Sequence, residues 1–425
     1  MYLYNSQNLK NKEIFILVLL ISASIIVRIP IILFFGDETL QNEWRILVSN
    51  LSTHGTLAFD YHQNELNKYL LPNIWMPPLY AYFLYFFSFF NLEYQNYIKI
   101  ILIFQILLSS VSVALFYKIN KNFFSQRISI FSSLLFSFFP VHLYACGQVS
   151  SISLQSFFII LFIYFFLKIL EKRNFIFIFS LSFTGGLLIL LRGEFYVFFI
   201  LTIFYLFFFF KIPIKNILLM ILITLITISP YLTRNILIFD KVILTKSLGY
   251  NLWKGNNEMA SVQGYENYKN DSFVNLKNEI NNLEKNSLYE INRDKIFLNH
   301  ATKNLINDPI LYSQLFFKKL FSFYFIDFNS SYPNYYKFLH YFPIILIAIL
   351  SFPGLFIFFS KINNNSHYIL LYLLLNLLVF SIFFILPRYK LIILPIQIMI
   401  ASHFINYFYM KIINGNKKKN NFKKV

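Results

Sequence analysis

This chain of 425 residues has a single cysteine, few charged residues and no glycine-rich phosphate loop. Its single cysteine, Cys146, excludes an internal disulfide framework and any metal site built from several thiolates. Charged residues make up 13% of the chain, whereas a soluble globular protein carries about 25%. No glycine-rich loop of the kind that holds nucleotide phosphates occurs. These deficits exclude an ordinary soluble protein and leave no motif for a nucleotide donor.

Apolar residues dominate what is present. They make up 57% of the chain and recur in runs of about 20 residues, the length that crosses a bilayer as a helix. We therefore predict an all-α polytopic membrane protein, a bundle of about 10–11 spans with surface helices on its outer face. The predicted spans are 14–35, 98–117, 128–146, 150–167, 175–191, 195–210, 216–233, 341–360, 367–386 and 391–410.

A net charge of +18 is common among proteins that bind nucleic acid, but the distribution of the charges indicates a membrane protein that binds none. Basic residues gather in alternate short connections, which the positive-inside rule places in the cytoplasm together with residues 1–13 and the tail 411–425. Among the acidic residues, only Glu13 and Glu171 then lie inside. The sequence therefore predicts a multi-pass protein of a bacterial inner membrane with a cytoplasmic N-terminus.

This topology divides the chain into an N-terminal seven-span module, 14–234, and a C-terminal three-span module, 341–410. Two polar segments fall outside: the acidic first loop, 36–76, and a large periplasmic loop, 235–340, with helical patterns of its own. The apolar stretch 77–90 is short for a span, so we interpret it as an interfacial helix on the outer face. A short eleventh span is the alternative, and it would invert the charge pattern that follows.

The first outer loop opens with a carboxylate pair, Asp37 and Glu38, directly after the first span. A carboxylate facing water at a membrane boundary is a candidate proton acceptor. Residues 38–51 have apolar positions at helical spacing and end before His54-Gly55, which predicts an amphipathic surface helix. The plainer interpretation is that the two acids cap this helix.

Four cations break the positive-inside pattern by lying at outer ends of predicted spans. An ionisable group at this depth is costly unless it is paired or solvated, and a set of them suits a lipid phosphate. The alternative for each one is a side chain that reaches the interface and has no further role. These residues are Arg192, Arg234, Arg388 and Lys390.

Taken in order, several short motifs resemble those of the polyprenyl-phosphate-dependent GT-C glycosyltransferases, the protein O-mannosyltransferase-like family that includes the aminoarabinose transferases. The resemblance extends over roughly residues 14–400. Its motifs are Gly36-Asp37-Glu38-Thr39, His54-Gly55, Pro77-Pro78-Leu79-Tyr80, Leu191-Arg192-Gly193-Glu194, Pro230-Tyr231-Leu232-Thr233-Arg234-Asn235, the segment 249–257 and Arg388-Tyr389-Lys390-Leu391.

The resemblance implies an inverting transfer of a sugar from a polyprenyl-phosphate donor in the membrane to a glycan, lipid or protein acceptor at the outer face. Asp37 matches the catalytic aspartate of the family. Trp75-Met76 replaces a Glu-Lys pair of the aminoarabinose transferases, which argues against that sugar and removes one donor contact. The chain also departs from the family at Gln41, where a tyrosine is usual.

Further residues are candidates for the acceptor or the sugar, because carboxylates, amides and aromatic faces suit hydroxyl-rich ligands. A divalent cation such as Mg²⁺ or Mn²⁺ bound by Glu38 or Glu43 stays open. The segment that holds Asn251, Trp253 and Asn257 has a folded loop turn as its plain alternative. The candidates are Glu43, Tyr80, Asn251, Trp253 and Asn257.

Two other functions remain as alternatives. An O-antigen ligase or polymerase also has many spans, but its key residues usually lie in the late outer loop rather than in an acidic first loop. A flippase or transporter without chemistry would show internal repeats and ionisable residues at mid-membrane depth. No clear repeat occurs in this sequence.

Overall fold

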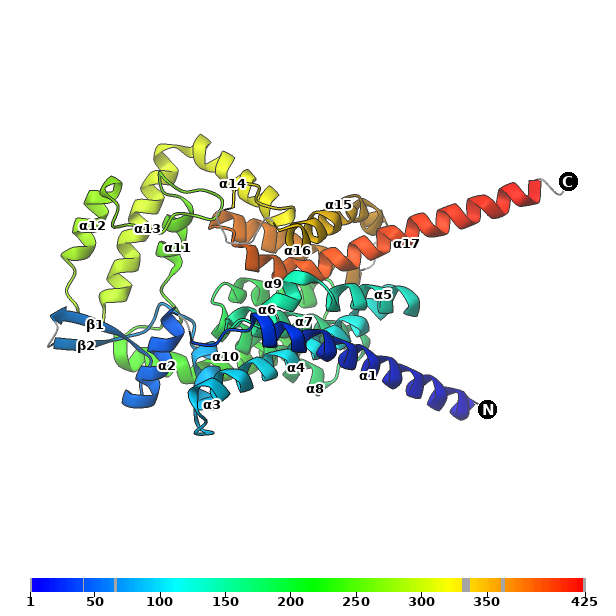
Figure 1. The fold of residues 1–425 in the computed structure, drawn as a ribbon, viewed down its shortest axis with the longest axis horizontal. Coiled ribbons are helices and arrows are strands. Elements are labelled where there is room, and N and C mark those ends of the chain that lie inside the picture. Colours follow the sequence, from blue (N-terminus) through cyan, green and yellow to red (C-terminus); the bar gives the residue numbers. More distant parts are fainter. Residues whose placement is uncertain (1, 41, 65–66, 331–336, 361–363, 423–425) are drawn as a thin grey trace.

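A computed structural model describes residues 2–40, 42–64, 67–330, 337–360 and 364–422. Apart from one hairpin the elements are helices (Figure 1). The helices of the N-terminal half are α1 (Tyr2–Phe35), α2 (Asn42–His54), α3 (Pro78–Ser88), α4 (Tyr94–Lys121), α5 (Gln126–Ser137), α6 (Pro140–Cys146), α7 (Ser151–Glu171), α8 (Phe175–Leu191), α9 (Phe195–Phe208) and α10 (Ile214–Phe239). Those of the C-terminal half are α11 (Leu248–Gly255), α12 (Val274–Asn281), α13 (Tyr289–Asn307), α14 (Pro309–Tyr324), α15 (Phe338–Ser360), α16 (Asn364–Ile382) and α17 (Lys390–Phe422), with 3-10 turns at Asp271–Phe273 and Pro387–Tyr389.

The membrane bundle agrees with the predicted spans. Six of the described helices are long and apolar enough to cross a membrane, and α5 with α6, bent by 55° at their break, counts as a seventh when the pair is taken as one span. Proline at position 140 starts α6 because it lacks the N–H that would continue the preceding helix. Three shorter apolar helices, Phe175–Leu191, Phe195–Phe208 and Ser366–Ile382, match the remaining predicted spans. The chain is an integral, multi-pass membrane protein.

Burial separates the centre of the bundle from its lipid-facing rim. In the most apolar windows of α4, α7 and α17, 61–67% of the residues are buried inside the protein. In α1 and α10 the same share is 22% and 28%, so these helices present most of their apolar surface to lipid. One large apolar cluster joins α4, α7, α8, α9, α16 and α17 and forms the core.

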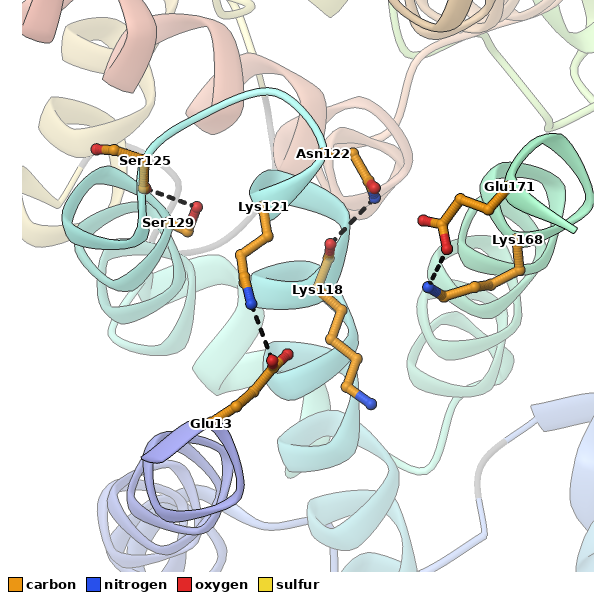
Figure 2. A network of polar contacts seen from close by, with 8 residues as sticks. All are labelled: Glu13, Lys118, Lys121, Asn122, Ser125, Ser129, Lys168 and Glu171. Carbon is orange, nitrogen blue, oxygen red and sulfur yellow. Dashed lines mark hydrogen bonds and ion pairs between the residues drawn. The ribbon is translucent and has the colours of Figure 1, made fainter. Parts of the chain in front are cut away.

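Both ends of the chain lie at the same end of the bundle, and α11, α12, α13 and the hairpin lie at the opposite end (Figure 1). Lys121 of α4 reaches Glu13 at 2.9 Å, and Lys168 pairs with Glu171 at 2.6 Å (Figure 2). The two acids that the sequence places inside are thus each neutralised by a lysine.

The first outer loop holds both a confirmed helix and an unexpected hairpin. Helix α2 ends at His54, and Gly55 follows with φ +67°, the left-handed conformation that stops the helix. The antiparallel strands β1 (Ala58–Asn64) and β2 (Asn67–Pro72) were not predicted. Helix α3 is too short to span, as interpreted, and it packs against α2, α4 and α8.

Candidate active site

Asp37 lies where α1 ends and the chain turns away from the bundle. A Cβ on Gly36 would lie 2.5 Å from the carbonyl oxygen of Ile32, so only glycine allows this sharp exit. The N–H of Asp37 donates to the carbonyl of Gly147 at 2.9 Å, and its Oδ2 accepts the N–H of Val149 at 2.7 Å. The turn between α6 and α7 therefore clamps Asp37 from both its backbone and its side chain.

The carboxylate of Asp37 remains open for chemistry on its second oxygen. In the described residues Oδ1 has no hydrogen-bond partner, and the residue is only half-buried. Burial raises the pKa of Asp37, while the Val149 N–H opposes this shift. The capping interpretation is wrong because α2 begins at Asn42, beyond both acids. The neighbouring Glu38 is exposed to solvent.

Three side chains support the turn that holds Asp37. Tyr80, which is fully buried in α3, donates to Oε1 of Gln105 at 3.2 Å. The amide of Gln105 in turn donates to the carbonyl of Gln148 at 2.8 Å. Gln148 donates to the carbonyl of Phe35 at 3.2 Å and so connects the turn to the end of α1. Tyr80 is thereby placed as a positioning residue rather than a surface for sugar.

Arg192 keeps one buried nitrogen without a partner. Its Nε forms an ion pair with Oε1 of Glu194 at 3.2 Å, and its guanidinium lies 5.0 Å from the ring centre of Tyr389. Within the described part of the chain, Nη2 is buried with no hydrogen-bond partner. Buried guanidinium N–H groups are normally satisfied, so Nη2 is a candidate donor to an anionic ligand.

A single apolar cluster connects the surroundings of Asp37 and Arg192. It contains Leu40, three residues after Asp37, together with Val149 and Leu191. Because Val149 binds Asp37 and Leu191 precedes Arg192, the two charged groups flank the same buried cluster.

Two of the other predicted phosphate ligands are occupied by main-chain carbonyls. Arg234 donates to the carbonyls of Asn73 and Leu57 at 2.7 and 2.9 Å. Lys390 donates to the carbonyls of Phe323, Tyr324 and Phe325, which end α14. The three carbonyls use all three donors of the Lys390 ammonium, whereas Arg234 keeps N–H groups beyond those that bind Asn73, Leu57 and Asn235. The sequence pattern cannot place these carbonyls beside the two cations, because they belong to distant segments.

Arg388 differs from both of these cations. It is exposed and lies 5.7 Å from the ring centre of Tyr389, the ring that Arg192 also approaches. Because Arg388 lies beside Tyr389, it stays a predicted phosphate ligand at the exposed edge of the site.

The predicted sugar contacts in α11 are mostly internal. Trp253 is 1% exposed and packs among Phe273 and Phe297, so no face of its indole is open to a ligand. The Asn257 side chain donates to the carbonyl of Tyr265 at 2.9 Å and accepts the N–H of Met259. These contacts correspond to the folded loop turn.

The other acceptor candidates are more accessible. Asn251 and Glu43 are each partly exposed, in the first half of α11 and the first turn of α2. Across the described ranges, no three His, Cys, Asp or Glu side chains lie close enough together to hold a metal ion.

Comparisons with known proteins agree with this architecture. Residues 76–233 match the family of dolichyl-phosphate-mannose-protein mannosyltransferases. The archaeal oligosaccharyltransferase AglB from Archaeoglobus fulgidus, in complex with an inhibitory peptide and a dolichol-phosphate, is similar with a TM-score of 0.57 and 11% identity. That alignment covers 97% of this chain and 52% of AglB; the apo form of the enzyme gives a TM-score of 0.57 with 96% and 52% coverage.

ArnT from Cupriavidus metallidurans, bound to undecaprenyl phosphate, aligns with a TM-score of 0.38 and 10% identity over 91% of this chain and 77% of ArnT. No curated protein sequence matches the chain. The chain spans about half the length of the oligosaccharyltransferase. The resemblance predicted from the motifs is confirmed: the chain has the GT-C fold, and a segment of it matches the mannosyltransferase family.

Proposed function

We propose that this protein is an inverting glycosyltransferase that moves a sugar from a polyprenyl-phosphate donor to an acceptor at the outer face of its membrane. The observation that carries the proposal is the clamped carboxylate of Asp37, whose Oδ2 is fixed by Val149 while Oδ1 stays open. The mannosyltransferase match and the dolichol-phosphate bound to the related fold of AglB support a lipid-phosphate donor.

In this mechanism Asp37 is the general base. Oδ1 takes the proton of an acceptor hydroxyl or amine while the acceptor atom attacks the anomeric carbon. The bond between that carbon and the phosphate oxygen breaks with inversion, and the electron pair leaves on the polyprenyl phosphate. A positioned base of this kind contributes about 10²–10⁴-fold to the rate. Burial raises the pKa of Asp37 and so makes it a stronger base than an exposed aspartate.

Arg192 is the proposed partner of the departing phosphate. The phosphate gains negative charge as the sugar leaves, and a prearranged guanidinium stabilises that charge without reorganising. Its buried Nη2 is available for a phosphate oxygen, while Nε pairs with Glu194. Arg388 lies beside the same tyrosine at the exposed rim and would meet the lipid phosphate as it enters.

The polar ends of the molecule support an orientation. The lysines at the ends of α4 and α7 would face the cytoplasm of a bacterium, and Asp37, the hairpin and α11–α13 would face the periplasm. Glu38, which is exposed, and Glu43, which is partly exposed, would orient the acceptor. The acceptor itself is a glycan, a lipid or a protein.

The test is sugar transfer in membranes that carry the chain, using a panel of polyprenyl-phosphate sugars. The wild-type protein is compared with Asp37→Asn, which keeps an oxygen for the Val149 N–H but cannot take a proton. The matched control is Asp240→Asn, since Asp240 is exposed and sits in a left-handed conformation that asparagine also adopts.

Transfer by the wild type and the control, lost in Asp37→Asn at equal expression, is the expected result. Full activity of Asp37→Asn would overturn the assignment of the base. Movement of a lipid-linked sugar across the membrane, without any transfer from any donor, would favour the flippase alternative instead.

A further inference from the structure

Helix α14 connects the outer domain, formed by α11–α13 and the hairpin, to the helices α15–α17 of the bundle (Figure 1). With 16 residues it is shorter than a helix that crosses a membrane. Its C-terminal half nevertheless packs on the outer end of α16, where the ring centres of Phe323 and Phe380 lie 5.5 Å apart. The hydroxyls of Tyr324 and Ser351 lie 2.8 Å apart, and Ser351 is near the middle of the span α15. The end of α14 therefore lies at the depth of the spans.

The carbonyl groups at this end are bound by side chains of α17. Lys390 donates to the carbonyls of Phe323 at 2.9 Å, of Tyr324, and of Phe325 at 3.2 Å. The amide of Gln397 donates to the carbonyl of Tyr324 at 2.9 Å. Lipid offers no donors, so backbone carbonyls at membrane depth need donors from the protein. The last turn of α14 has such donors, as a helix end within a bilayer requires.

The two lysines of α14 separate its bundle side from its open side. Lys319 is fully buried and donates to the carbonyl of Gly255 at 2.8 Å and to Oδ1 of Asn256 at 3.0 Å. The amide of Asn256 donates in turn to the carbonyl of Ile382 at 2.8 Å, so this side of α14 is fixed to both α11 and α16. Lys318 is exposed, and a lysine beside an apolar face can reach the headgroup phosphates with its ammonium.

The open side of α14 is apolar. Ile310, Phe317 and Phe321 are 71%, 65% and 49% exposed, and their spacing places them along one side of the helix. The polar Gln314 lies on the same side, one turn nearer the outer domain than Phe317. A contiguous exposed face of large apolar residues marks contact with a membrane or with another protein.

This apolar face continues onto α15. The ring of Phe321 stacks on that of Phe325 at 4.8 Å, and Phe325 lies 6.0 Å from Phe352 of α15. Phe352 and Phe356 are 48% and 68% exposed on a span of which only 33% of the most apolar window is buried. Water, a second copy of the chain or lipid could cover the face of α14. Its continuity with the exposed apolar side of a span favours lipid.

We propose that the C-terminal half of α14 is inserted into the membrane leaflet next to the outer domain, with Phe317 and Phe321 in contact with phospholipid acyl chains. The helix then fastens the outer domain to the bilayer as well as to the bundle, because its other side is bonded to α11. This inference goes beyond the proposed transfer reaction and requires neither Asp37 nor a sugar donor.

The test places a nitroxide label on the full chain in nanodiscs of phosphatidylethanolamine and phosphatidylglycerol, without any polyprenyl lipid. Cys146, the single cysteine, is buried and is replaced in a Cys146→Ser background. The labelled variants are Phe317→Cys and Phe321→Cys. Phe356→Cys is the lipid-facing control, and Asp271→Cys is the water-facing control, since the Asp271 side chain is 99% exposed in the outer domain. Melting temperatures confirm that each variant is folded.

Accessibility of each label is measured to oxygen, which concentrates among acyl chains, and to a nickel chelate, which stays in water. Phe317→Cys and Phe321→Cys are expected to resemble Phe356→Cys, with high oxygen and low nickel accessibility. Phe321→Cys is expected to lie deeper than Phe317→Cys, because it is one turn nearer the end of α14 that the bundle encloses.

Nickel accessibility at both positions equal to that of Asp271→Cys would place the face in water and overturn the proposal. Protection from both reagents, with magnetic coupling between labels on two copies, would identify a second copy as the occupant and overturn it as well. The readout does not involve sugar transfer, so its outcome is independent of whether Asp37 is the base.

Discussion

The N–H of Val149 donates a hydrogen bond to Oδ2 of Asp37 at 2.7 Å, across 112 positions of the chain. This contact joins the end of the first span to the turn between α6 and α7. It fixes the direction of the carboxylate and leaves Oδ1 without a hydrogen-bond partner among the described residues. The first prediction concerns the protonation of this group.

We expect transfer to fall on the acidic side at a higher pH than an exposed aspartate would give. Burial raises the pKa of Asp37, and a general base works only when it is ionised, so the acid limb of the rate profile moves upward with the pKa. The profile of kcat/KM between about pH 4 and pH 8 checks this, since that parameter reports groups of the free enzyme. An acid limb at the position of an unperturbed carboxyl would contradict it.

Asp37→Asn is expected to be at least as stable as the wild-type protein. The folded-state pKa is raised, so folding holds the proton more tightly and the ionised carboxylate destabilises the fold as the pH rises above the unfolded pKa. The neutral amide removes this penalty and keeps the bond to Val149. Melting temperatures at neutral pH check the sign, and a clear loss of stability would assign Asp37 a structural role.

Arg192→Gln is expected to lower kcat/KM by about 10²-fold, the usual effect of removing one donor that stabilises developing charge. Arg192→Lys should recover only part of this rate, because an ammonium cannot replace the guanidinium fork. The control is Arg45→Gln, since Arg45 is exposed on the surface of α2. Equal rates for Arg192→Gln and the control would remove Arg192 from the site.

Lys390→Met is expected to destabilise the protein without changing the affinity for the donor. The ammonium bonds three carbonyls at the end of α14, and each buried acceptor left without a donor costs about 1–3 kcal/mol. A lower melting temperature with an unchanged donor KM supports this structural role. A folded variant with a much higher donor KM would restore the phosphate interpretation drawn from the sequence.

Glu290→Ala is expected to loosen the segment before α3 and lower the melting temperature, because the N–H groups of Ile74 and Trp75 lose their acceptor. Glu290→Gln should keep most of the stability, since its amide oxygen can accept the same bonds. Burial raises the pKa of Glu290, so folding disfavours its ionised form relative to the unfolded chain, and a neutral amide avoids that penalty. Equal losses in the two variants would contradict this explanation.

The local signals in the sequence were sufficient for the spans and for the place of Asp37. The length of each apolar run and the positions of the flanking lysines can be counted from neighbouring residues. These two local features predicted the apolar helices that are able to cross a membrane. The stop of α2 at His54-Gly55 is local for the same reason. The hairpin of β1 and β2 lacked such a signal, because its strands pair with each other and not with a larger apolar face.

Only the tertiary structure decided which charged side chains have free donors or acceptors. Arg234 meets carbonyls 161 and 177 positions away, and Glu290 meets N–H groups more than 200 positions away. A cation at the right depth therefore looks the same in the sequence whether it binds carbonyls, as Arg234 does, or keeps a buried nitrogen without a partner, as Arg192 does at Nη2. The sequence by itself determined the apolar spans and placed Asp37 directly after the first of them. Packing between distant segments determined which charged side chains already have partners, because hydrogen bonds depend on distance in space and not on distance along the chain.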